Sequence, residues 1–98
     1  MQMKTFSDDE LAEIEKMAGL CFTPEQIAIV LQFDVEEFRK LYNDKLGPVF
    51  LHYQRGSLMH ETEVRNSIYQ LAKGGSSAAQ QQYLALMKSR DNLIFKTK

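Results

Sequence analysis

The apolar side chains of this chain recur at intervals of three and four residues, a spacing that places them on one face of an α-helix. Short stretches containing Gly, Pro, Ser, Thr or Asp separate the apolar segments. No stretch alternates apolar and polar residues in the manner of a half-buried β-strand, and the sequence has no internal repeat or low-complexity segment. The pattern predicts an all-α protein of about five helices.

The first predicted helix begins after Ser7, because Ser7 and Glu10 have the spacing of a capping box. It is expected to end near Gly19. The single cysteine, Cys21, follows it; one cysteine gives no disulfide or thiolate metal cage within a chain, and we expect a small buried apolar residue. The buried face of this helix is predicted to consist of Leu11, Ile14, Met17 and Ala18.

Residues 23–46 contain two helix starts close together. Thr23 with Gln26, and then Asp34 with Glu37, have the capping-box spacing, and a proline at the first helical position supports the earlier start. Two starts this close require a sharp turn between two short helices. Their buried faces are predicted to be Ile27, Val30 and Leu31 in the first helix and Val35, Phe38, Leu41 and Tyr42 in the second.

Gly47 and Pro48 end this pair, and Pro48 also suits the start of a fourth helix that runs towards Gly74 and is about 40 Å long. Gly56, inside this helix, marks a bend, a close backbone approach or a tolerated glycine. The main apolar stripe of the helix comprises Phe50, Tyr53, Ser57, His60, Val64, Ile68 and Leu71, and a thinner stripe comprises Leu51, Leu58 and Tyr69.

Gly74 and Gly75 end the fourth helix, and Ser77 with Gln80 has the spacing of a capping box that starts a fifth. The two helices are predicted to form an antiparallel hairpin. The apolar residues of the fifth helix are Tyr83, Leu84, Leu86 and Met87, and a tail from Asp91 carries the apolar cluster Leu93, Ile94 and Phe95.

The length of 98 residues allows one compact domain, in which residues 1–47 form a three-helix head and residues 48–98 form the hairpin and tail. The net charge of -1 is unevenly distributed. Residues 1–22 carry two basic and five acidic side chains, residues 23–47 carry three and five, and residues 48–98 carry seven and three. The C-terminal half is therefore the basic half, which a nucleic acid partner would favour.

No signal-peptide pattern or apolar run of membrane-spanning length is present, so we expect a cytoplasmic protein with no membrane partner. Catalytic constellations are also absent. His52 and His60 are about 80° apart around a helix and are no ligand pair. The HETE run that starts at His60 lacks the second histidine of a zinc-protease helix, and His60 is expected to be half-buried. We therefore expect no enzyme, no cofactor, no metal and no small-molecule substrate.

The two short helices resemble a helix-turn-helix motif. Ala28 stands where such motifs place a small residue, and Phe33 occupies the apolar turn position. Gln32 departs from the pattern, because the motif usually has a glycine there in a left-handed conformation; Gln32 would be strained or the turn would differ. The positions that match the buried residues of the motif are Ile27, Leu31, Phe38 and Leu41.

The order of the downstream elements is similar to that in small terminase subunits of tailed phages and related phage helix-turn-helix proteins. The resemblance covers roughly residues 18–90. It implies recognition of double-stranded viral DNA at packaging, ring-like homo-oligomerisation through the hairpin, and delivery of DNA to a large terminase subunit. The features that carry it are Phe50, Tyr53, the QRG step at residues 54–56, and a helix-hairpin turn at Leu71, Ala72, Gly75, Ser76 and Ala78.

In such a motif the second helix enters the major groove with its outward-facing residues towards the base edges. Arg39 is the best candidate for reading guanine, Asn43 for adenine, and Lys40 with Lys45 for phosphate. The adjacent acids Glu36 and Glu37 stabilise the helix start but repel phosphate, so Arg39 and Lys40 are alternatively a solvated face paired with those glutamates. The candidate DNA-binding residues are Gln26, Gln32, Glu36, Arg39, Lys40, Asn43 and Lys45.

Two alternatives share the same architecture. One is a helical adaptor that binds protein, which the acidic N-terminal half favours. The other is a small transcription regulator, although the chain offers no clear dimer or effector segment for one. The adaptor and the DNA-binding hypotheses both use exposed apolar residues for association, and the candidates are Leu51, Leu58, Tyr69, Leu93 and Phe95.

Overall fold

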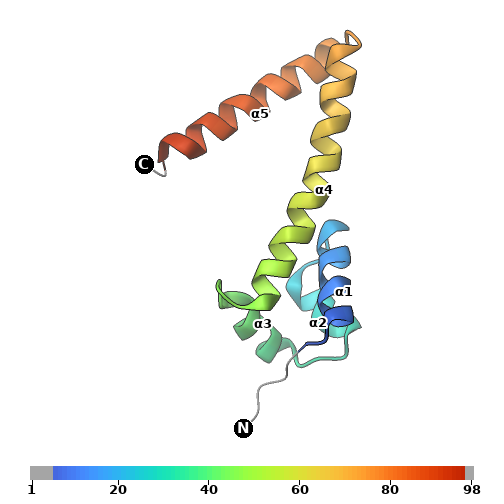
Figure 1. Cartoon of the computed structure of the whole chain (residues 1–98), viewed down its shortest axis with the longest axis vertical. Coiled ribbons are helices and arrows are strands. Elements are labelled where there is room, and N and C mark those ends of the chain that lie inside the picture. Colours follow the sequence, from blue (N-terminus) through green and yellow to red (C-terminus); the bar gives the residue numbers. More distant parts are fainter. Residues whose placement is uncertain (1–5, 97–98) are drawn as a thin grey trace. The chain divides into compact units, whose positions relative to one another are not determined.

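The computed structural model describes residues 6–96, which contain five helices and no strand (Figure 1). The prediction of an all-α protein is confirmed. The elements are α1 Asp8–Gly19, α2 Pro24–Val30, α3 Val35–Asn43, α4 Pro48–Lys73 and α5 Ser77–Lys96.

Internal contacts divide the chain into two units, the head unit Met1–Glu61 and the C-terminal unit Thr62–Lys98. The division lies inside α4, whereas the sequence placed a boundary at residues 47–48. The first half of α4 belongs with the head because its side chains pack on α1 and α3, through contacts such as Tyr53 with Tyr42 and His52 with Glu15.

The helix starts of the head unit follow the predicted caps. Ser7 Oγ accepts a hydrogen bond from the Glu10 N–H at 3.1 Å, and Glu10 Oε1 accepts one from the Ser7 N–H at 3.0 Å. Thr23 and Gln26 bond reciprocally in the same way, at 3.2 and 3.0 Å. Asp34 Oδ1 accepts from the backbone N–H three residues later at 2.9 Å. These bonds satisfy amide groups that a helix start otherwise leaves unpaired.

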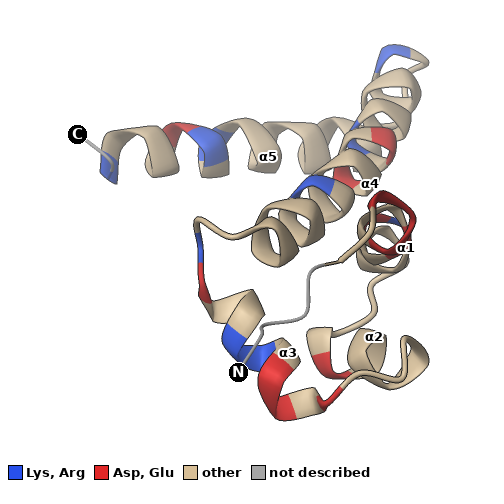
Figure 2. Ribbon diagram, turned by 60° about the horizontal axis from the view of Figure 1, so that its bottom comes forward, with Lys and Arg blue, Asp and Glu red and all other residues tan. Residues whose placement is uncertain are grey.

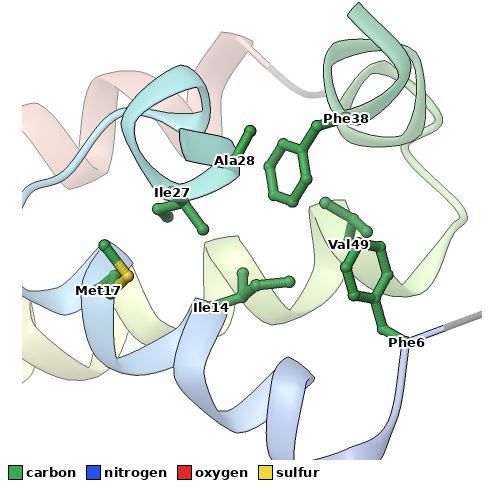
Figure 3. Packing of buried hydrophobic residues seen from close by; sticks show 7 residues of the cluster. All are labelled: Phe6, Ile14, Met17, Ile27, Ala28, Phe38 and Val49. Carbon is green, nitrogen blue, oxygen red and sulfur yellow. The ribbon is translucent and has the colours of Figure 1, made fainter. Parts of the chain in front are cut away.

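The core of the head unit lies between α1, α2, α3 and the start of α4 (Figure 3). Phe6, Phe33 and Phe38 form an aromatic group whose ring centroids are 5.2 to 6.1 Å apart, in tilted and edge-to-face arrangements. Val30 was predicted to be buried and is 58% exposed, because the seven-residue α2 turns only one side towards the core. The buried members of the core are Phe6, Ile14, Met17, Ile27, Ala28, Phe38 and Val49.

The backbones of α1 and α4 approach each other closely at Gly56, which is buried inside α4. A Cβ at this position would lie 2.0 Å from the carbonyl oxygen of Glu15 on α1. Of the three interpretations of Gly56, the close approach is therefore the one observed. On the same side, Glu15 pairs with His52 Nδ1 and, at 3.3 Å, with Arg55 Nε.

In the C-terminal unit, the last turns of α4 and the start of α5 meet at the connecting turn. The rings of Tyr69 and Tyr83 are 5.4 Å apart, and Gln80 Nε2 donates to the Ala72 carbonyl at 3.1 Å. The predicted cap is wrong by one residue: Ser76, not Ser77, accepts from the N–H of the third helical residue, at 3.2 Å. Two adjacent serines made the choice ambiguous in the sequence.

The C-terminal unit has a small core. Ala79 is its one buried residue within the described part of the chain. Val64 and Leu71, which were predicted on the main apolar stripe of α4, are 45% and 60% exposed. Leu93 and Phe95 lie on α5, which continues through the predicted tail, and are 62% and 79% exposed.

Candidate nucleic-acid interface

The turn between α2 and α3 is closed by a residue with left-handed backbone. Gln32 is in the left-handed region with φ of 56°. The Phe33 N–H donates to the Ala28 carbonyl at 2.9 Å and the Gln32 N–H donates to the Ile29 carbonyl at 3.1 Å. These two bonds form a Schellman motif, which requires a left-handed residue at the Gln32 position. Gln32 therefore adopts the strained conformation that a glycine would adopt more easily.

The residue at the small position of the motif, Ala28, is completely buried, as is Phe38 on α3. Phe33 is partly buried against the same core. This packing fixes α2 against α3 and leaves the opposite side of α3 open to solvent. The exposed residues on that side are Glu36, Glu37, Lys40 and Asn43.

Charges of both signs lie along α3, with the acidic residues at its start and the basic residues after them (Figure 2). Arg39, the best candidate for reading a base, is engaged by two carboxylates. Arg39 Nη1 donates to Glu36 Oε1 at 2.7 Å, and Arg39 Nε donates to Glu25 Oε1 on α2 at 3.4 Å. The contact with Glu36 agrees with the alternative interpretation, in which the neighbouring glutamates pair with Arg39 on a solvated face. Glu25 is an additional partner.

The pKa values of Arg39 and Glu25 both depart from their ordinary values. The hydrogen bond with Glu36 is the largest cause that raises the pKa of Arg39, followed by the charge of Glu36 and then the hydrogen bond with Glu25. Hydrogen bonding to the backbone is the largest cause that lowers the pKa of Glu25; burial opposes it, and Arg39 lowers it further. Both groups are exposed enough for water and salt to screen the pair, so its value lies in orienting Arg39 more than in stability.

Sequence reasoning missed Glu25. It is the second residue of α2 and lies 14 positions before Arg39, so that no local pattern connects the two. The crossing of α2 and α3 brings them together. In two short helices that pack together after a tight turn, an acid early in the first and a cation in the middle of the second are the signal that would have indicated the pair.

The remaining predicted DNA-binding residues have different settings. Gln26 is exposed, but its side-chain oxygen is already held by the Thr23 N–H in the α2 cap. Gln32 is exposed in the turn, and Lys45 is exposed in the connection between α3 and α4. The structure therefore brings Glu36, Arg39, Lys40 and Asn43 together on α3, with the others on flanking segments.

The predicted association residues are exposed. Leu51 and Leu58 are 52% and 56% exposed on the first half of α4. In the C-terminal unit, Tyr69 is 41% exposed while one of its faces contacts Lys73, whose Nζ is 5.4 Å from the ring centroid. Leu46, which was not among the predicted association residues, is 90% exposed in the connection before α4.

The prediction that Cys21 is buried is wrong, because its side chain is exposed. Cys21 has φ of 70° and ends α1 in a Schellman motif, with the Phe22 N–H donating to the Met17 carbonyl at 3.1 Å. Cys21 therefore lies just beyond the last turn of α1 and is not part of its buried face. His60 is half-buried, as expected.

Within residues 6–96, no group of three or more His, Cys, Asp or Glu side chains is arranged to hold a metal ion. No helix in that range is both long enough and apolar enough to cross a membrane. Comparisons with protein-family models, with curated proteins and with solved structures gave no match to this chain.

Proposed function

We propose that this protein is a non-enzymatic DNA-binding protein that holds duplex DNA with the α2 and α3 helix-turn-helix, in the manner of the phage small terminase subunits that its sequence resembles. One observation carries the proposal. The turn keeps a left-handed residue at Gln32 despite the absence of glycine, and this backbone presents one side of α3 to solvent.

In this function α3 enters the major groove. Arg39 offers a planar fork to a guanine edge, and Asn43, one turn further along, is suited to an adenine edge. Lys40 and Lys45 are exposed point charges suited to phosphate. With few cations and several acids on the head, a single copy would bind DNA weakly, and we expect several copies to act together.

The exposed apolar residues support self-association. A unit whose single described buried residue is Ala79 cannot be stabilised by its own core. Large apolar side chains on α5, including Leu84 at 62% and Leu93 at 62% exposure, would be covered in an assembly of like chains. The assembly would also place several α3 helices along one duplex.

A protein-binding adaptor is the second candidate function. The ion pairs of Arg39 with Glu25 and Glu36 favour it, because they neutralise the cation best suited to a base. An adaptor would use the apolar residues Leu51 and Leu58 for a protein partner, and duplex DNA would not change its behaviour.

The two functions are distinguished by titrating a fluorescently labelled duplex with the full-length chain at low ionic strength. DNA binding predicts a saturable signal that the double substitution R39A/K40A weakens by about tenfold or more. Lys16→Ala removes an exposed cation from α1 and should have a much smaller effect. Absence of binding by the wild-type chain would favour the adaptor, provided that light scattering shows self-association lost on making Leu51 and Leu58 polar.

A further inference from the structure

Two carboxylates from different helices share the guanidinium of Arg39. The side chain of Glu25 on α2 is 44% exposed and contacts Nε, whereas that of Glu36 on α3 is 74% exposed and contacts Nη1. The two contacts therefore use different nitrogens of one planar group that has five N–H donors. They also differ in exposure, and the carboxylate of Glu36 is the more accessible of the two to a macromolecule.

A guanine edge offers two acceptors, N7 and O6, and takes two donors from an arginine. If Glu25 keeps Nε, the donors that remain for guanine are those of Nη1 and Nη2. Nη1 is the atom that Glu36 holds at 2.7 Å. Nη1 has two N–H donors, and Glu36 accepts from it through one contact. Guanine binding in this orientation is therefore compatible with the contact from Glu25, whereas it brings the base acceptors to the nitrogen that the Glu36 carboxylate already occupies.

We propose that Glu25 and Glu36 act in opposite ways on DNA selectivity: Glu25 positions Arg39 for a guanine edge, and Glu36 competes with DNA for the same donor group. This inference rests on the proposed function. Glu36 also repels the phosphate backbone. Binding of α3 against this repulsion is most favourable where a base offers Arg39 two acceptors at once. Glu25 and Glu36 are positioning residues, since each acts through Arg39.

The chain supplies a matched control in Glu37, which is exposed and next to Glu36 on α3. The charges and hydrogen bonds that shift the pKa of Arg39 come from Glu36 and Glu25, not from Glu37. Replacement of Glu37 by glutamine removes the same charge from the same helix turn without releasing Arg39. Any general electrostatic gain appears in E37Q as well and can be subtracted.

The test compares full-length wild-type, E25Q, E36Q and E37Q chains on two duplexes, one enriched by the wild-type chain from a randomised pool and one scrambled. We expect E36Q to bind the scrambled duplex at least about threefold more tightly than E37Q does. We also expect the ratio of the affinity for the enriched duplex to that for the scrambled duplex to be smaller in E36Q than in the wild-type chain. For E25Q we expect the ratio to fall by about 5- to 150-fold, the range that one bidentate base contact supplies. If Glu25 had only a structural role, E25Q would not lower this ratio without also lowering the thermal midpoint of unfolding.

A second comparison places E36Q and E37Q in an R39A background. If Glu36 acts through Arg39, the two double variants should bind both duplexes equally. A difference between E36Q and E37Q that persists without Arg39 would overturn the inference, as would identical behaviour of E36Q and E37Q in the wild-type background. Failure of the wild-type chain to bind any duplex would overturn the proposed function and this inference together, whereas duplex binding with unaltered selectivity in E25Q and E36Q would overturn this inference alone.

Discussion

Substitution of Gly56 by alanine tests the packing that holds α1 against α4. The added Cβ would lie 2.0 Å from the Glu15 carbonyl oxygen and 2.7 Å from both the carbonyl carbon and the Cα of Glu15. All three atoms belong to the backbone, so that no side-chain rotation relieves the contact. Restoring a contact of about 3.4 Å requires the two helices to separate by about 1.4 Å.

The expected cost is the difference between two effects. Overpacking in a tight core costs about 1–3 kcal/mol. The cost of G56A lies at the upper end, because the added Cβ meets backbone atoms of Glu15 that cannot move without moving α1. Alanine recovers about 1 kcal/mol of helix propensity relative to glycine. We therefore expect the free energy of unfolding of the head unit to fall by about 2 kcal/mol, which corresponds to a decrease of about 8–16 °C in its thermal midpoint.

Urea unfolding followed by circular dichroism measures this change, and two other glycines provide a graded control. At Gly19 a Cβ would lie 3.2 Å from the Gly56 carbonyl oxygen, and we expect an intermediate loss of about 1 kcal/mol. At Gly74 the nearest atoms are 3.5 Å away, an ordinary contact, so G74A should change stability by less than about 0.5 kcal/mol. A free energy of unfolding for G56A within about 0.5 kcal/mol of wild type would refute the packing argument.

Three further predictions concern the turn between α2 and α3, Tyr53, and the thinner apolar stripe of α4. Gln32→Gly should raise the free energy of unfolding by about 0.5–1 kcal/mol, because glycine adopts φ of 56° without strain; a lower urea midpoint would contradict this. Tyr53 donates to the Phe22 carbonyl at 2.7 Å, and burial, followed by the charges of neighbouring groups, raises its pKa above 10.0. The contribution of Tyr53 to the free energy of unfolding is thus fully present below pH 10 and is lost as pH rises through the folded-state pKa. Y53F should lower the free energy of unfolding by about 1 kcal/mol at neutral pH and remove this loss at alkaline pH. An alkaline unfolding curve that is the same in Y53F and wild type would count against this prediction. Replacing Leu51 and Leu58 by lysine should weaken self-association in light scattering at unchanged helix content, whereas an unaffected mass would exclude this stripe from the interface.

Local signals were sufficient to predict most helix boundaries. The caps at Ser7, Thr23 and Asp34 each depend on a side chain and an amide three residues apart, and such short-range bonds follow from sequence spacing alone. The prediction at residues 76–77 was off by one, because either serine satisfies the same local rule and only the path of the preceding turn decides between them.

Burial was less predictable, since it depends on which elements meet. Val30 has the right spacing for a buried face, but α2 is too short to bury more than one side. Cys21 is exposed in the turn that ends α1, a setting that composition does not indicate. The Glu25 and Arg39 pair is likewise a product of helix crossing, and it changes how the interface is interpreted.

The salt dependence of duplex binding tests the central claim of DNA binding by α3 most directly. The logarithm of the affinity of the full-length chain should fall linearly with the logarithm of salt concentration, and K40A should reduce the slope by about 1, the change expected on losing one phosphate contact. Lys16→Ala, on α1, should leave the slope unchanged. No binding even at about 20 mM salt, or a slope that K40A and K16A change equally, would contradict the account.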